Sequence, residues 1–463
     1  MTAVKNNKRN FTEGPLFFRI LIFTLPIMIT GLLQIVYNIA DNVVVGRFSG
    51  DDLALAAVGS TMGITALITN FWFGFAGGGA IIVAQRFGAK DHEGVSKAAH
   101  TIMTVAIIGG VVFTVIGLAL SRPTLELMGT KPELIDKAEL YLKIVFLGVP
   151  ATSIYNFGAS IIRSTGDSKT PLIILSTSGL LNVILNLVFV IVFHMSVAGV
   201  AIATVASQYL SAIWISILLL LKGNECYGIR LSKLRIDKSS LLSIFRYGIP
   251  TGIQNSMFSI SAVMMSSAVN TLPTAAVSAR AISNNIDQLC HTTIASFGTA
   301  AVTVVGQNYG AVKPERIKRS IFYLVIQSGT IGIILGQILL LFAANIASFY
   351  IEPSNPLASE TLDFTVHILT ITLTTSFLNG IWQTLSGAVR GMGYSISAMI
   401  ISLFGACLFR MTWIFFIFPL EPMNNVTGLF SVFPFSWTIT GIMLGINAFI
   451  AYRNTKRKAE QSS

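Results

Sequence analysis

Charged residues are scarce in this chain of 463 residues. Lys, Arg, Asp and Glu make up 11% of it, whereas hydrophobic residues make up 53%. Soluble globular proteins usually carry about 25% charged residues, so this composition argues against a soluble domain. The few charges stand in short clusters between long apolar runs, such as Ile102–Leu120 and Ser395–Phe418. A run of ~20 apolar residues is long enough to cross a bilayer as a helix.

Sequence patterns that mark several other protein classes are missing. Cysteine occurs only at positions 226, 290 and 407, and this spacing suits neither a disulfide framework nor a metal site. The chain has no P-loop, HExxH or Gly-x-Ser-x-Gly motif, which argues against ATP-driven pumping and common hydrolases. We therefore expect an all-α membrane protein that is not an enzyme and needs no cofactor or metal. A membrane-embedded enzyme remains a more distant alternative.

The apolar runs predict about twelve transmembrane helices. Their cores lie near residues 16–45, 55–84, 100–120, 141–162, 172–193, 199–221, 242–269, 277–305, 321–342, 364–388, 395–418 and 429–451. The first run is too long for the apolar part of a signal peptide, so we expect it to remain as a membrane helix.

The net charge of +11 is distributed unevenly between the two predicted sides. Of 31 Lys and Arg residues, about 24 lie at the two termini and in alternate loops, and about five lie on the opposite side. Two more, Arg280 and Arg410, lie inside predicted spans. Cytoplasmic loops of membrane proteins are enriched in Lys and Arg, so both termini are predicted to be cytoplasmic. Membrane topology accounts for the basic charge, and we expect no nucleic-acid partner.

Three short motifs occur twice, in the same order, at offsets of about 222 to 227 residues. The pairs are Val83–Ala89 with Val305–Ala311, Leu25-Pro26 with Ile249-Pro250, and Arg163–Gly166 with Arg390–Gly393. This repeat predicts two pseudo-symmetric six-helix bundles, residues 1–221 and 241–463, joined by a cytoplasmic linker at 222–240. Pro26 and Pro250 interrupt helix hydrogen bonding at matching places, which favours a role in conformational change.

Asp41 is one of two acidic residues that fall well inside predicted spans. An acid at the bilayer centre costs roughly 3 kcal/mol, so it marks a functional site by default. Gln34, Tyr37 and Asn38 stand on the same helix face at i−7, i−4 and i−3. This stripe indicates a carboxylate that binds a proton or a sodium ion. The alternative is a structural hydrogen-bond cluster.

Asp287 is the second intramembrane acid. It shares a helix face with Asn284 and His291, and Arg280 lies seven residues before it. Two interpretations remain open for Asp287: a second coupling or cation site, or a structural pair with Arg280.

The chain closely resembles the multidrug and toxic compound extrusion (MATE) family from about Leu16 to Ala451. The resemblance rests on Leu25-Pro26 followed by Asp41, the doubled VAQRFGA/VGQNYGA motif, Arg163–Asp167, Asn182–Asn186 and Val197–Thr204. It implies twelve helices in two lobes and export of amphipathic, often cationic, organic compounds in exchange for protons or sodium ions. It also implies that Asp41 is the coupling site, surrounded by Tyr37, Asn182, Asn186 and Thr204. Many relatives carry Asp where this chain has Asn186, and Gln254–Ser259 lacks an acid that some relatives have.

The remaining expectations concern mechanism and partners. We expect alternating access in the cell membrane, specifically a bacterial cytoplasmic membrane, by a monomer surrounded by lipid. Gln34, Tyr37 and Asn156 are candidate substrate contacts. The alternatives are a flippase of lipid-linked saccharides, a narrow-specificity metabolite exporter of the same superfamily, and a transporter of the major facilitator type.

Overall fold

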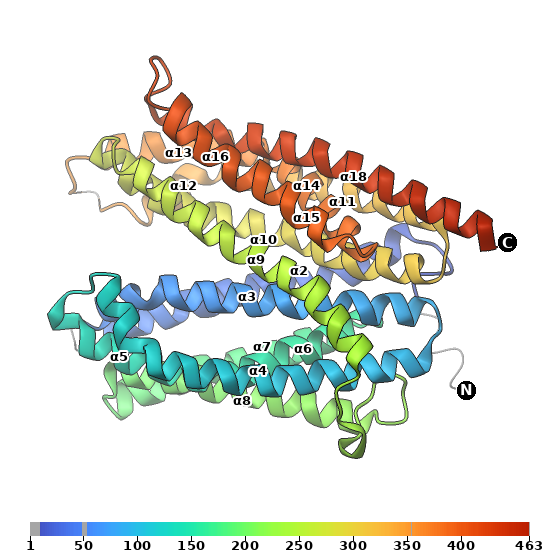
Figure 1. Cartoon of the computed structure of the whole chain (residues 1–463). Coiled ribbons are helices and arrows are strands. Elements are labelled where there is room, and N and C mark those ends of the chain that lie inside the picture. The colour runs from blue at the N-terminus through green and yellow to red at the C-terminus, as the bar shows by residue number, and fades with distance from the viewer. Residues whose placement is uncertain (1–9, 49–52, 353, 463) are drawn as a thin grey trace. The chain divides into compact units, whose positions relative to one another are not determined.

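The computed structural model describes residues 10–48, 53–352 and 354–462. These residues form helices joined by short loops, and they contain no strand (Figure 1). The predicted all-α fold is confirmed.

Each predicted span of the N-terminal half corresponds to a helix or a helix pair. The elements are α2 (Phe17–Phe48), α3 (Ala54–Gly88), α4 (His92–Leu127), α5 (Pro132–Leu147), α6 (Val149–Ser164), α7 (Lys169–Leu187), the π-helical η1 (Val188–Val192) and α8 (Ser196–Leu221). Local sequence accounts for several helix starts. The Asp91 carboxylate caps α4 by accepting a hydrogen bond from the Gly94 amide at 2.8 Å, and Pro132 occupies the first turn of α5.

The C-terminal half follows the same plan after a short 3-10 turn, η2 (Leu231–Lys233). Its main elements are α9 (Lys238–Val269), α10 (Thr274–Gly310), α11 (Pro314–Leu341), α12 (Ala343–Ser348), α13 (Ala358–Thr374) and α14 (Ser376–Gly391). The last part comprises α15 (Ser395–Ser402), η3 (Leu403–Leu408), α16 (Phe409–Thr412), η4 (Trp413–Ile417), α17 (Val426–Phe430) and α18 (Val432–Ser462).

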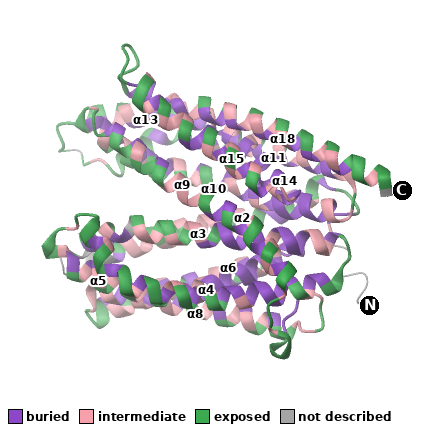
Figure 2. Ribbon diagram, viewed as in Figure 1, coloured by how far each residue is buried: buried purple, intermediate pink, exposed green. Residues whose placement is uncertain are grey.

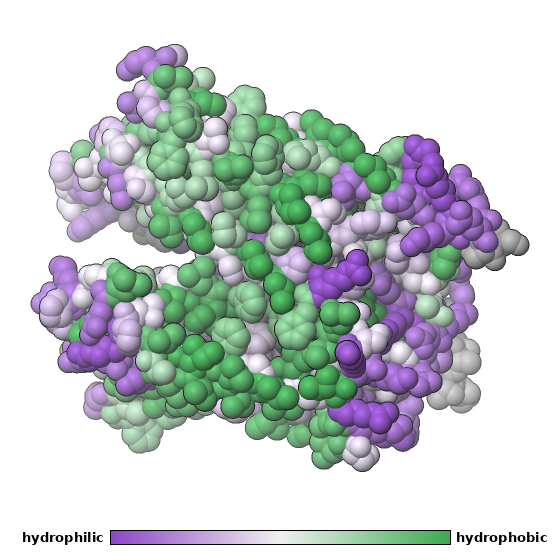
Figure 3. All heavy atoms as spheres, in the orientation of Figure 1, coloured by the Kyte–Doolittle hydropathy of each residue, from purple (hydrophilic) through white to green (hydrophobic). Residues whose placement is uncertain are grey.

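The helices have the length and composition of membrane spans. In the part of the chain that the structure describes, nine are long and apolar enough to cross a bilayer, and the bent pairs α5–α6 and α13–α14 raise this to eleven. Helix α9 has 32 residues but is less apolar, since Gln254, Asn255 and several serines interrupt it. In each half, hydrophobic atoms cover the middle of the helices and hydrophilic atoms gather towards their ends (Figure 3).

The chain divides into two compact units. Ile29–Gly252 form most of the first, here the N-unit, and Phe11–Met28 with Ile253–Ser463 form the second, the C-unit. The sequence placed the first and seventh helices whole in one lobe each, whereas these boundaries fall inside α2 and α9, shortly after Pro26 and Pro250. Contacts of the first part of α2 explain its assignment: for example, the Gln327 amide donates to the Phe17 carbonyl at 2.7 Å.

The backbone repeats the sequence duplication. Lys90 and Val312, at equivalent positions of the two halves, both have positive φ, at 60° and 52°, and Gly166 and Gly393 both have φ of 89°. The bend between α5 and α6 is 42°, and the equivalent bend between α13 and α14 is 44°. Within each unit the same succession of long helix, tight turn and bent pair is therefore built from both copies of the sequence.

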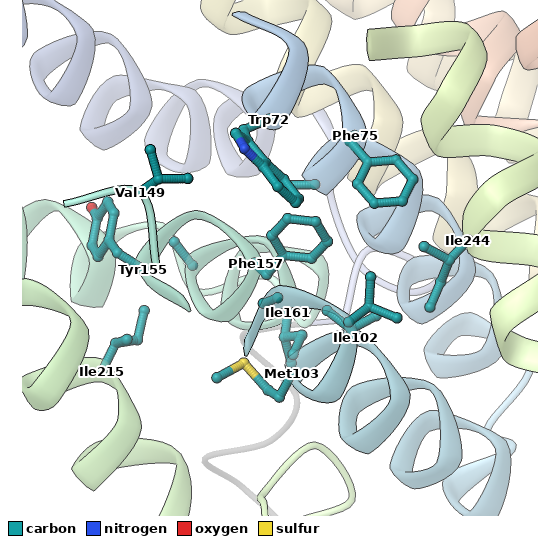
Figure 4. Close-up of a cluster of buried hydrophobic side chains, with 14 of the residues drawn as sticks. Trp72, Phe75, Ile102, Met103, Val149, Tyr155, Phe157, Ile161, Ile215 and Ile244 are labelled. Atoms are coloured by element: carbon teal, nitrogen blue, oxygen red, sulfur yellow. The ribbon is translucent and has the colours of Figure 1, made fainter. Parts of the chain in front are cut away.

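Aromatic side chains fill the core of the N-unit (Figure 4). Phe157 is completely buried, and its ring lies 5.8 Å from that of Trp72 and 5.6 Å from that of Phe75. Edge-to-face pairs of this kind stabilise the packing of α3 against α6 beyond the burial of apolar area. Buried and exposed residues alternate along the helices (Figure 2). Many of the exposed residues are large and apolar, as expected for helices that contact lipid.

Candidate functional site

The structure brings Asp41 together with polar residues of two other helices of the N-unit. The side-chain amide of Asn186 donates a hydrogen bond to the Asp41 carboxylate, and the Thr204 hydroxyl is a second donor to it. Asp41 lies on α2, Asn186 on α7 and Thr204 on α8. The three helices therefore converge on one carboxylate.

Asn182 completes this group, which we call the Asp41 cluster. Its amide donates to the Thr204 hydroxyl at 3.3 Å, and its carbonyl oxygen accepts from the Asn186 amide at 3.4 Å. The two asparagines stand one turn apart on α7 and are 5% and 0% exposed. The Asn186 Oδ1 atom is buried and accepts no hydrogen bond from the described residues. A buried oxygen without a donor is uncommon and can serve a bound cation.

Tyr37 lies on the same face of α2 as Asp41 but hydrogen-bonds to a residue of another helix. Its hydroxyl donates to the Ser176 carbonyl on α7 at 3.1 Å rather than to Asp41. Its ring covers Gly179, where any Cβ atom would collide with it. Tyr37 thus docks α2 onto α7, one turn before Asp41. Tyr141 of α5 also interacts electrostatically with Asp41, and no pattern in the sequence pointed to it.

The predicted substrate contacts do not form one group. Gln34 is exposed on α2, whereas Asn156 is buried on α6 with 9% exposure. In the described part of the chain, Asn156 hydrogen-bonds neither to Gln34 nor to Tyr37. Their roles as substrate contacts stay predictions.

Asp287 of the C-unit stands among two arginines. Arg280 and Arg410 both interact electrostatically with it, yet within the described residues neither guanidinium forms an ion pair with its carboxylate. Both guanidinium groups lie over the ring of Phe433, at 5.8 Å and 4.7 Å from its centre. The sequence located both arginines inside spans but did not connect them, because they are 130 residues apart.

The polar face of α10 continues beyond Asp287. His291 lies one turn further along, and its Nε2 atom is 3.3 Å from the Gln383 amide nitrogen of α14. The same amide donates to the Asn379 side chain at 3.2 Å. Asn284 is exposed on this face. The C-unit therefore contains a second polar group, chemically unlike the Asp41 cluster.

Asp237 and Cys226 lie in the linker, outside the membrane helices, and have shifted pKa values. Hydrogen bonds from Ser240 lower the pKa of Asp237 below its usual value, and the Ser240 amide lies 2.8 Å from the carboxylate. Burial raises the pKa of the Cys226 thiol, with the Glu225 charge as a smaller cause. A thiol with a raised pKa is poorly nucleophilic, so Cys226 is not suited to act as a nucleophile.

Comparison with known proteins decides the family. The profile described as MatE matches residues 26–188 and 250–416, one segment in each half of the chain. This protein belongs to the MatE family. Its MatE relatives include the probable multidrug resistance protein YoeA of Bacillus subtilis, which is 29% identical over 392 residues that cover 83% of each chain. The multidrug export protein MepA of Staphylococcus aureus is 23% identical and covers 91% of this chain and 90% of its own.

Solved structures share the fold of this MatE protein. One, an outward-facing conformation of a multidrug resistance MATE family transporter, has a TM-score of 0.89 at 22% identity and covers 96% of this chain and 98% of its own. Because MatE proteins are transporters, the chain is a multi-pass membrane transporter and not an enzyme. The predicted family is confirmed. The orientation of the termini and the roles of the site residues stay predictions.

Proposed function

We propose that this MatE protein exports amphipathic organic compounds in exchange for protons or sodium ions. Its relatives carry names of multidrug resistance and multidrug export proteins. The observation that supports ion coupling is the Asp41 cluster. It places a carboxylate, two amides and a hydroxyl in the membrane-spanning part of the N-unit. Among the described residues, no basic side chain hydrogen-bonds to the Asp41 carboxylate.

The Asp41 cluster suits a small cation in two ways. A carboxylate in low-dielectric surroundings is costly as a lone charge, so it gains by taking up a proton or a sodium ion. The Asn186 side-chain amide donates its N–H to Asp41. Rotation of this amide group by about half a circle around its Cβ–Cγ bond would turn Oδ1 towards a bound cation. Together with Asn182 and Thr204, this rotation would offer a set of oxygen ligands.

Alternating access couples the cation to the cargo. Binding at Asp41 favours the state with low cargo affinity, and release favours the opposite state, so each ligand displaces the other. A rearrangement of α2 near Pro26 would displace Asp41, which lies further along the same helix, and Pro250 stands at the matching place in α9. If one proton exchanges for one monovalent cation, a pH unit supplies ~1.4 kcal/mol, about tenfold accumulation.

Proteoliposomes test this proposal. Purified protein is reconstituted, a pH or sodium gradient is imposed, and movement of a fluorescent amphipathic dye is followed for the wild type and Asp41→Asn. We expect gradient-driven movement in the wild type that disappears in the variant, and the effective gradient identifies the ion. Ser160→Ala serves as a matched control, because it removes a buried hydroxyl of the N-unit that donates to the Phe157 carbonyl at 2.8 Å and not to Asp41.

Two results would contradict the proposal. Undiminished transport by Asp41→Asn would move ion coupling away from the cluster. A lack of dye movement under either gradient would favour a flippase of lipid-linked saccharides or a narrow-specificity metabolite exporter. The positive charge that the sequence suggested for the cargo also stays a prediction. The charged residues around Asp287 in the C-unit are relevant to the charge of the cargo.

A further inference from the structure

The membrane-spanning part of the C-unit carries an excess of positive charge at one place. Arg280 of α10 and Arg410 of α16 contribute two guanidinium groups, whereas Asp287 contributes one carboxylate. The arginines also interact electrostatically with each other, which is unfavourable between like charges. Arginine in a membrane is expensive unless it is paired or faces a polar cavity. Two arginines around a single acid therefore leave one charge without a counter-charge from the described residues.

Aromatic rings hold the two guanidinium groups in place. Arg280 lies over Phe430 at 5.4 Å and over Phe433 at 5.8 Å, and Arg410 lies over Phe433 at 4.7 Å. Stacking on a ring orients the plane of a guanidinium group but uses none of its N–H donors. The arrangement thus positions the donors without satisfying them.

Most of these donors are unused. In the described part of the chain, the guanidinium group of Arg280 makes no hydrogen bond, and Arg410 makes one, from Nε to the Ser436 hydroxyl at 3.1 Å. Both side chains are partly exposed. The backbone around Arg410 is also irregular, since π-helical turns stand on both sides of α16. Such turns are rare and occur frequently at functional sites.

We propose that Arg280, Arg410 and Phe433 form a binding site for the acidic group of an amphipathic organic anion, such as a carboxylate or sulfonate. A guanidinium fork matches the geometry of these oxyanions. The partly exposed ring of Phe433 offers an apolar surface for the body of the ligand. The buried rings of Phe430 and Trp437 support it from behind, at 6.1 Å and 5.7 Å. The inference rests on the proposed export function for the claim that this ligand is the cargo.

Asp287 acts as a regulator of this site rather than as a cation site. Its carboxylate competes electrostatically with the ligand for the two arginines but is not hydrogen-bonded to them. It therefore limits how tightly the anion binds and permits its release. Neutralising Asp287 removes this competition. Loss of either arginine should therefore weaken anion binding, whereas loss of the Asp287 charge should strengthen it.

Equilibrium binding to the purified full-length protein in detergent tests the inference. The probes are naphthylacetate and naphthylmethylammonium, which share an aromatic body and differ in charge. Isothermal titration calorimetry should show stronger binding of the anion by the wild type. Arg280→Gln and Arg410→Gln should weaken anion binding by about 10- to 100-fold, the usual effect of losing a hydrogen bond to a charged group. Asp287→Asn should strengthen it.

The opposite sign of Asp287→Asn separates a binding role from a structural one. If Arg410→Gln does not fold, Arg410→Lys keeps the charge without the fork, and Asp287→Asn still tests the direction. Preferential binding of the ammonium probe, or weaker anion binding by Asp287→Asn, would overturn the inference. So would binding of phosphatidylglycerol in the absence of naphthylacetate binding, which would indicate an anionic lipid site.

The binding experiment needs no gradient, so it is independent of the transport test. Anion binding without ion-driven transport would leave this site standing and refute the export function. Ion-driven transport by a protein that binds only the cationic probe would support the export function and refute the anion site.

Discussion

The N-unit and the C-unit share a backbone plan but differ in the charge they place inside the membrane. In the N-unit, α7 brings Asn182 and Asn186 to Asp41, and the group carries one negative charge. In the C-unit, the corresponding segment after the bent pair brings Arg410 to Arg280 and Asp287, and the group is positive. The same backbone plan thus carries polar groups of opposite formal charge in its two copies.

This difference in charge between the two units shows that a carboxylate in a membrane helix does not by itself identify a cation site. Asp41 and Asp287 are both acids inside predicted spans, and each has polar neighbours on its helix face, although Arg280 precedes only Asp287. Only Asp41 is surrounded by neutral amides and hydroxyls, whereas Asp287 lies in the field of two guanidinium groups. We therefore propose different roles for the same residue type: cation binding in the N-unit and control of anion binding in the C-unit.

The largest expected effect comes from making the N-unit resemble the C-unit. Asn186→Arg would place a guanidinium group beside the Asp41 carboxylate and weaken cation binding there by about 10- to 1000-fold. Gradient-driven dye transport in proteoliposomes should fall to background. Asn186→Ala removes the same hydrogen bond without adding charge and should retain part of the activity. Equal activities of the two variants would show that charge at position 186 is unimportant.

An intermediate effect is expected from two glycines that allow close packing in the two units. A Cβ atom at Gly179 would collide with the Tyr37 ring, and one at Gly405 would collide with the Thr440 hydroxyl. Alanine at either position should cost ~1–3 kcal/mol of stability, as overpacking usually does. We expect Gly179→Ala to impair ion-driven transport and Gly405→Ala to impair binding of the anionic probe. Thermal unfolding measures the loss of stability. If both variants lost transport and anion binding to the same degree, the proposed division of roles between the two units would be wrong.

The smallest effect is expected for the docking of α2. Tyr37→Phe removes the hydrogen bond to the Ser176 carbonyl and should cost ~0.5–1.5 kcal/mol. Tyr155→Phe is a matched control, because its hydroxyl also donates to a backbone carbonyl, that of Pro171, at 3.0 Å. Both variants should lose similar stability in thermal unfolding, but only Tyr37→Phe should slow ion-driven transport. A comparable slowing by Tyr155→Phe would assign Tyr37 a purely structural role.

Much of the fold could be predicted because it depends on local patterns. Apolar runs of membrane length predicted the helices, and the repeated motifs predicted matching backbone features. The positive φ of Lys90 and Val312 lies directly after the doubled glycine-alanine motif. The bends before α6 and α14 were not predicted, because no proline or charge marks both of them.

The composition, the periodicity and the repeat by themselves determined that this is a helical membrane protein with Asp41 in a polar stripe. These properties follow from the cost of polar groups in lipid, which constrains each helix separately. The family resemblance had already implied that Asn186 lies near Asp41. The other pairs became visible only in the tertiary structure: Tyr37 with Ser176, and Arg280 with Arg410 around Phe433. Such pairs join distant parts of the chain, and Coulomb and hydrogen-bond energies depend on their separation in space, which sequence spacing does not specify.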